Sequence, residues 1–135
     1  MAAYALDANT LIYLLRGMIP LGKIENEIYK GNQIIIPSLA CYEVLRHLRY
    51  LNASRRIRDF EGLVKKGALA FMDKESLDMA VSIYAELKQR SLTIPDIDIL
   101  VAAIARSKGM ALVTNDAHFG YIEHLKLENW LPAED

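Results

Sequence analysis

Hydrophobic and polar positions along the chain follow two different periods. Short apolar runs at 3–6, 34–36, 68–72 and 111–114 lie between turn and polar residues, which is typical of buried strands. Between these runs, apolar residues recur every three to four positions, and this spacing predicts helices. A further short run at 125–127 predicts a fifth strand. Because helices separate the strands, the connections must be crossovers, and the sheet is expected to be parallel.

Polar residues, proline and glycine mark where the helices begin and end. Asn9 or Thr10 is the expected N-cap of the first helix, and Asp73 is the expected N-cap of the helix after the third strand. The Ile94–Pro95 step predicts a loop, and Lys108–Gly109 predicts the end of the next helix. We therefore expect an α/β fold over residues 1–135, a three-layer α/β/α sandwich in one domain with four or five parallel strands.

Four acidic residues follow apolar runs or open helices: Asp7, Glu43, Asp98 and Asp116. In an open parallel sheet, the carboxyl ends of the strands form one edge, and ligands bind in the crevice there. A fold that gathers these four carboxylates creates an oxygen-only pocket of high negative charge, which needs a hard divalent cation. The pattern indicates metal-dependent chemistry on a phosphate backbone.

A single Asp after a strand is most often a helix cap, as we expect for Asp73. Glu43 is harder to explain in that way. It lies one turn into a helix, within the apolar pattern of Tyr42 and Leu45, where an unpaired carboxylate is costly. Four acidic residues in such settings therefore indicate a site more strongly than any one of them does.

Composition excludes several classes of protein. Hydrophobic residues make up 53% of the chain and charged residues 24%, which is typical of a folded protein. The formal net charge of −1 gives no general basicity for nucleic acid. Cys41 is the single cysteine, so no internal disulfide forms, and a reducing cytoplasm is the expected location. We expect no signal peptide and no membrane span, since no apolar run approaches about 20 residues.

The histidines and the cysteine do not follow a zinc-binding pattern. Cys41 stands alone, and His47, His118 and His124 lack the spacing of zinc ligands. We interpret His118 and Phe119 as a capping or packing pair. No glycine-rich phosphate loop is present, so a nucleoside-triphosphate enzyme is not expected. Acidic oxygen ligands favour Mg²⁺ or Mn²⁺.

Basic residues are concentrated in one segment. Between 46 and 66 there are seven basic and two acidic residues, and Tyr50 is available for stacking. Such a segment is able to follow an RNA backbone. A solvent-exposed helix pair that serves solubility explains the pattern equally well. The candidate RNA-binding residues are Arg46, Arg49, Arg55, Arg56 and Arg58.

Four segments, in order, carry a resemblance to a known family. They are 4–12, 37–45, 94–103 and 112–119, and together they extend over almost the whole chain. With these segments the chain resembles the PIN domain ribonucleases, and most closely the VapC-type toxins of toxin–antitoxin pairs. No single segment is specific, but four in the right order are a strong signal.

The resemblance implies that the four acidic residues named above bind Mg²⁺ or Mn²⁺ and that a metal-activated water hydrolyses RNA. It also implies that Asn9 and Thr114 supply polar groups beside them. Asp96 is then a helix cap or an accessory carboxylate. Two positions depart from the family pattern: Ala8 stands where a hydroxyl residue is common, and His47 where a small residue often follows the Glu.

The leading hypothesis is a metal-dependent endoribonuclease that acts as a toxin, with a small antitoxin as partner and a homodimer as the expected assembly. A PIN nuclease of RNA processing is the main alternative. A phosphoacceptor receiver domain has the same layering, and Asp73 followed by Lys74 suits it. However, 111–116 offers no lysine to complete such a site. A non-catalytic interaction module would have no reason to retain four acidic residues.

Overall fold

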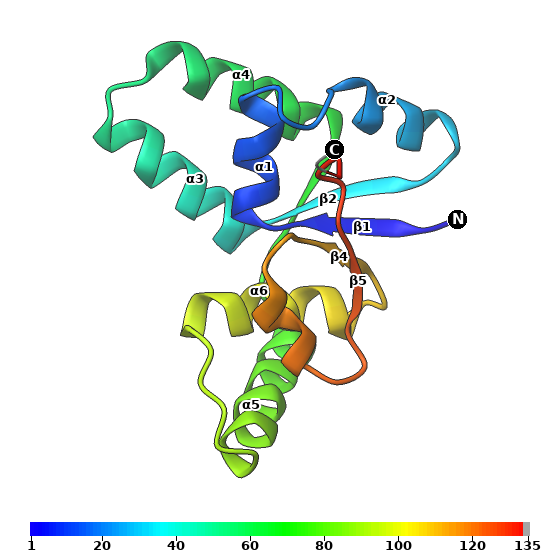
Figure 1. The fold of residues 1–135 in the computed structure, drawn as a ribbon, viewed down its shortest axis with the longest axis vertical. Coiled ribbons are helices and arrows are strands. Elements are labelled where there is room, and N and C mark those ends of the chain that lie inside the picture. The colour runs from blue at the N-terminus through cyan, green and yellow to red at the C-terminus, as the bar shows by residue number, and fades with distance from the viewer. Residues whose placement is uncertain (134–135) are drawn as a thin grey trace.

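Five short strands form one all-parallel sheet at the centre of the protein (Figure 1). The computed structural model describes residues 1–133. The order across the sheet is β3-β2-β1-β4-β5, which confirms the predicted parallel sheet. β3 stops two residues earlier than predicted, and β5 begins one residue later. The strands are β1 (Ala3–Leu6), β2 (Gln33–Pro37), β3 (Ala68–Ala70), β4 (Ala111–Val113) and β5 (Lys126–Glu128).

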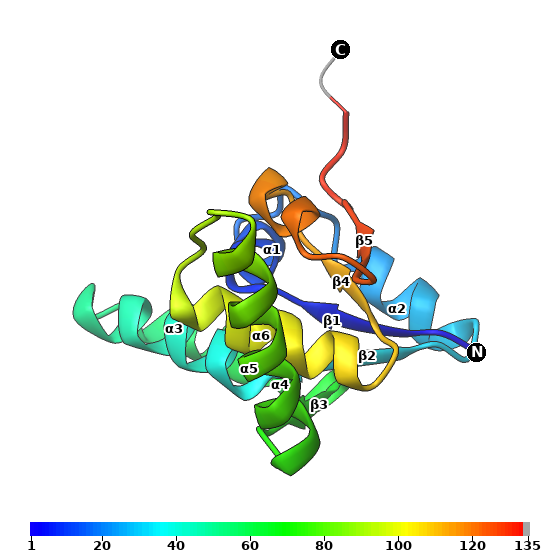
Figure 2. The ribbon, with the colours of Figure 1, turned by 90° about the horizontal axis from the view of Figure 1, so that it is seen from below.

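Helices cover both faces of the sheet, which confirms the three-layer sandwich. The helices that precede β3 lie on one face, and α5 and α6 lie on the other (Figures 1 and 2). Within residues 1–133, none of the helices has the length and apolar character that crossing a membrane requires. The helices are α1 (Ala8–Leu15), α2 (Gly22–Tyr29), α3 (Ser38–Tyr50), α4 (Ser54–Lys66), α5 (Lys74–Gln89) and α6 (Asp96–Ser107), with a 3₁₀ helix η1 (Ala117–Tyr121).

The strand order reverses once, between β1 and β4. From β1 the chain steps outward to β2 and β3, and it then returns across the other face to place β4 beside β1. Leu6 at the end of β1 is in register with Val113 at the end of β4. At such a reversal the connections leave on opposite faces, so a crevice opens at the carboxyl ends of the two strands. Asp7 and the segment that follows Val113 therefore border this crevice.

The start of α1 differs from the prediction. Its N-cap is Asp7, whose Oδ1 accepts a hydrogen bond from the Thr10 backbone N–H at 2.8 Å, whereas the sequence predicts Asn9 or Thr10. The helix begins directly after the strand, so Asn9 and Thr10 already lie inside its first turn. The Asp73 prediction is confirmed, since Asp73 caps α5 in a capping box with Ser76.

α6 is buried along most of its length because it lies between the sheet and α5. Its buried residues include small side chains at Ala102, Ala103 and Ala105, which allow close approach on both sides. The helix begins at Asp96, two residues before the expected start, so Asp98 lies in its first turn. The burial of α6 fixes the position of Asp98 relative to the sheet.

A close contact between Gly67 and β2 provides a test of how the segment between α4 and β3 packs on the sheet. A Cβ atom at Gly67 would lie 2.6 Å from the carbonyl oxygen of Ile34 on β2. Gly67→Ala is expected to lower the free energy of unfolding by about 1–3 kcal/mol, because backbone must move. A Cβ atom at Gly62 on α4 would have no neighbour within 4 Å. Gly62→Ala should therefore raise the free energy of unfolding by about 0.5–1 kcal/mol. Urea denaturation measures both, and wild-type stability of Gly67→Ala would contradict the packing.

Candidate active site

Asp7 is held at the carboxyl end of β1 by its own backbone and side chain. Its N–H donates to the carbonyl oxygen of Val113 at 3.2 Å, and its carboxylate caps α1. The side chain is almost fully buried, with 5% exposed. Burial raises the pKa of Asp7, while hydrogen bonds from Thr114 and Thr10 lower it without offsetting the effect of burial. The carboxylate is thus fixed in place at an electrostatic cost.

Asp98 and Asp116 reach the same place from other elements. Asp98 lies in the first turn of α6, and Asp116 follows β4 and caps η1. Burial raises the pKa of Asp98, and the negative charges of Asp116 and Asp7 raise it further. Asp116 also contributes to the raised pKa of Asp7. The three carboxylates therefore lie near enough to repel one another across the crevice.

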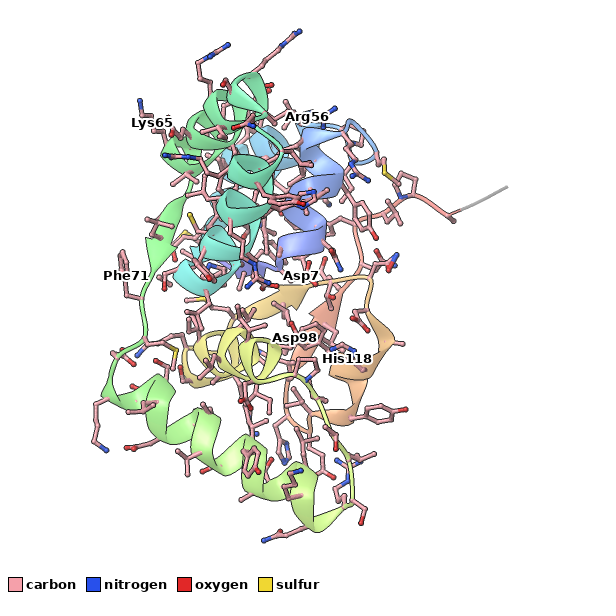
Figure 3. The ribbon with its side chains drawn as sticks, turned by 90° about the vertical axis from the view of Figure 1, so that its left-hand side faces the viewer. Asp7, Arg56, Lys65, Phe71, Asp98 and His118 are labelled. Carbon is pink, nitrogen blue, oxygen red and sulfur yellow. The ribbon has the colours of Figure 1, made fainter. Side chains whose placement is uncertain are left out.

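Glu43 approaches the other carboxylates from α3. Its pKa is raised first by burial, then by the charges of Asp98 and Asp7, and it is lowered by Arg46. Figure 3 shows Asp7 and Asp98 close together between the two helical layers. The acidic cluster, as we call Asp7, Glu43, Asp98 and Asp116, is therefore assembled from β1, α3, α6 and the segment after β4.

His118 is the residue of this site that sequence reasoning missed. Its ring packs on Phe119 with 4.9 Å between centroids, which agrees with the packing interpretation. However, its Nε2 also lies 3.1 Å from Asp98 Oδ2, and its Nδ1 lies 2.8 Å from Asp116 Oδ1. The contact with His118 lowers the pKa of Asp98. Asp98 is 20 residues away, so the one sequence signal was the position of His118 two residues after Asp116.

The donor atoms of the cluster fit a hard divalent cation. They are carboxylate oxygens, joined by the hydroxyl of Thr114. Burial, and then the charges of neighbouring carboxylates, raise the pKa of Asp7, Glu43 and Asp98. Within residues 1–133, no three His, Cys, Asp or Glu side chains are arranged closely enough to form a metal site as they stand. His118 contacts two of the carboxylates instead. The metal role of the cluster remains a prediction.

The accessory residues lie in three different places. Thr114 is buried among the acidic residues, and its Oγ1 accepts a hydrogen bond from the Asp116 N–H at 3.0 Å. Asn9 is exposed and lines a hollow of about 410 Å³ with Glu43. Asp96 is exposed and lines a separate hollow with Tyr84 of α5. Thr114 and Asn9 are therefore beside the cluster, and Asp96 faces α5.

The candidate RNA-binding arginines are spread over several surfaces. Arg46 lines the hollow beside Glu43, and Arg49 lines a groove of about 560 Å³ between α3 and α4. The Nη1 of Arg56 donates to the carbonyl oxygen of Leu15 at 3.4 Å. Arg58 lines a third hollow, and Arg55 is exposed on α4. Figure 3 places Arg56 well away from Asp7 and Asp98. Of the five, Arg46 adjoins the acidic cluster.

The chain belongs to the PIN domain family, whose pattern matches residues 4–125. It is 29% identical over 136 aligned positions to "Ribonuclease VapC2" of Haemophilus influenzae, covering 97% of this chain and 100% of the relative. It is also similar to a chain in the crystal structure of VapBC2 from Rickettsia felis bound to a promoter DNA fragment. That match has a TM-score of 0.78 and 26% identity, and covers 95% and 98% of the two chains.

A chain from DNA-bound VapBC of Salmonella typhimurium has the same fold, with a TM-score of 0.84 and 24% identity over 96% and 99% of the chains. The relatives therefore match this chain over nearly its whole length, from β1 to beyond β5. The four residues of the acidic cluster lie inside the matched region.

The buried charge of Asp7 predicts the effect of Asp7→Asn. Because burial raises the pKa of Asp7 above 3.8, the folded protein binds this proton more tightly than the unfolded chain does. The free energy of unfolding should then fall as pH rises from about 4 through the raised pKa. Asn is an equally good N-cap. In EDTA at pH 7.5, Asp7→Asn should melt above wild type, by about 3–5 °C for each kcal/mol relieved.

Melting curves between pH 5 and pH 8 test this expectation, and the difference should shrink toward the acidic end. Asp78→Asn is the control, because Asp78 is exposed and forms a surface pair with Lys74. A melting temperature of Asp7→Asn below wild type throughout this range would show that the Asp7 charge stabilises the fold.

Proposed function

We propose that this protein is a metal-dependent endoribonuclease and the toxin of a toxin–antitoxin pair. The observation that carries the proposal is the acidic cluster at the point where the strand order reverses, in which burial and neighbouring charges raise the pKa values of Asp7 and Asp98. Membership of the PIN domain family and the ribonuclease name of its relative support the reaction class. The proposed reaction is hydrolysis of an RNA phosphodiester to a 5′-phosphate and a 3′-hydroxyl.

Asp7, Glu43, Asp98 and Asp116 would hold Mg²⁺ or Mn²⁺. When bound, such a cation supplies positive charge for the phosphate and lowers the pKa of a bound water. The protein contributes orientation. Asp7 is fixed by the backbone N–H of Thr10. Thr114 positions Asp116, because its Oγ1 accepts a hydrogen bond from the Asp116 backbone N–H. His118 holds Asp98 and Asp116 toward each other, so these two carboxylates stay close together despite their repulsion.

We also propose a small antitoxin as the partner and the cytoplasm as the place of action. The Rickettsia and Salmonella chains similar to this one were each solved in a VapBC assembly bound to DNA. Physically, an antitoxin that places an Arg or Lys among the carboxylates would satisfy their charge and exclude the cation. A homodimer is the assembly that the family resemblance suggests. The partner and assembly proposals can fail without affecting the nuclease proposal.

Cleavage should depend on the cluster and on a divalent cation. Asp98→Asn is expected to lower the rate of RNA cleavage in Mg²⁺ or Mn²⁺ by at least about 100-fold, because several kcal/mol of charge stabilisation depend on the cation. EDTA should stop cleavage by the wild-type protein. Asp78→Asn on the exposed face of α5 is the matched control and should cleave normally. Undiminished cleavage by Asp98→Asn would refute this site.

The partner proposal is tested by co-expression with the adjacent small reading frame. Expression of the protein alone should arrest growth, and co-expression should restore growth and yield a complex that co-purifies. Light scattering of the protein alone should give twice the chain mass. If co-expression neither forms a complex nor restores growth while cleavage persists, the toxin assignment fails and a nuclease of RNA processing becomes the better description.

A further inference from the structure

A hollow of about 410 Å³ lies beside the acidic cluster, between α1 and α3. Glu43 belongs to both the cluster and the hollow, so a molecule bound in the hollow would adjoin the cluster. The volume is within the range of small-ligand sites. The lining residues are Ala8, Asn9 and Ile12 from α1, and Glu43, Arg46, His47 and Tyr50 from α3.

The residues from α3 form one stripe of the helix. Glu43 is followed by Arg46, His47 and Tyr50 at spacings of three, four and seven, which places all of them on one side. The opposite side of α3 carries the buried Val44 and Leu48. Core packing therefore does not account for the stripe. Tyr50 in particular is 84% exposed, so its aromatic ring contributes little to the stability of the fold.

The chemistry of the lining suits an uncharged aromatic group with hydrogen-bonding edges. Tyr50 offers a face for stacking, and base–aromatic stacking is tolerant of sequence. Asn9 and His47 offer donors and acceptors, and Ile12 supplies an apolar wall. Arg46 and Glu43 place one positive and one negative charge in the lining, so the hollow offers no net charge that attracts a phosphate. A base and its ribose therefore fit the hollow, with the adjoining phosphate directed toward the cluster.

We propose that this hollow binds the ribonucleoside next to the phosphate that is cleaved. Tyr50 stacks on the base, and Asn9 and His47 contact its polar edge. This inference rests on the proposed ribonuclease function and adds a subsite to it. His47 lines the same hollow, so its ring is placed to set a base preference.

A peptide segment of an antitoxin is the competing occupant. The lining favours RNA because its exposed aromatic ring lies beside hydrogen-bonding side chains and the Arg46 guanidinium rather than in an apolar groove. The groove of about 560 Å³ that Arg49 lines offers a peptide a better surface. It lies between α3, α4 and β3, and its apolar lining includes Tyr42, Leu69 and Phe71. The two occupants are separated by measuring RNA and antitoxin binding with the same variants.

The test measures binding of 5′-labelled octamers of rA, rC, rG and rU by fluorescence anisotropy. Ca²⁺ replaces Mg²⁺, under conditions in which gels show the RNA intact. Tyr50→Ala should weaken binding by about 5- to 100-fold, the effect of losing one stacked base. Tyr50→Phe retains the ring and should bind within about twofold of wild type. Tyr29→Ala is the control, because Tyr29 on α2 is 91% exposed and lies outside the hollow.

His47→Ala tests the base preference. It should change the order of affinity among the four octamers and should move the preferred cleavage positions in Mn²⁺. If Tyr50→Ala binds all four octamers as wild type does, or loses only antitoxin affinity, the inference is overturned while wild-type cleavage leaves the ribonuclease proposal standing. Failure of the wild-type protein itself to bind or cleave any RNA would instead overturn the proposed function, and the subsite with it.

Discussion

The carbonyl oxygen of Val113 joins the two strands on which the candidate site depends. It accepts hydrogen bonds from the Asp7 N–H at 3.2 Å and from the Thr10 hydroxyl at 2.9 Å. These contacts tie the end of β1 and the first turn of α1 to the end of β4. The reversal of strand order at this point opens the crevice, and the same contacts place the buried Asp7 carboxylate at its edge.

Burial of like charges follows from that geometry. The folded chain holds Asp7, Glu43 and Asp98 in positions where the pKa of each is raised, so the cluster opposes folding at neutral pH. Residues that serve a function commonly reduce stability in this way. Cation binding and antitoxin binding would relieve the same repulsion, and this shared electrostatic origin explains why one occupant would exclude the other.

The two sides of the crevice differ in what surrounds the acidic residues. On the α6 side, His118 contacts both Asp98 and Asp116. On the α3 side, Glu43 opens onto a hollow with exposed polar and aromatic side chains. Under the proposed function, RNA at the cluster would meet a positioned pair of carboxylates on one side and the proposed nucleoside subsite on the other.

The sequence by itself determined the parallel sandwich and indicated four candidate acidic residues, because strand periodicity and acidic residues beside apolar runs are local signals. Local signals also identified the Asp73 cap. Only the tertiary structure decided that Asp7 caps α1 and that His118 meets Asp98 across 20 residues. It also decided that Arg46 faces the cluster while Arg56 turns toward Leu15. Such contacts depend on how helices pack, and packing is set by the whole core rather than by neighbours in sequence.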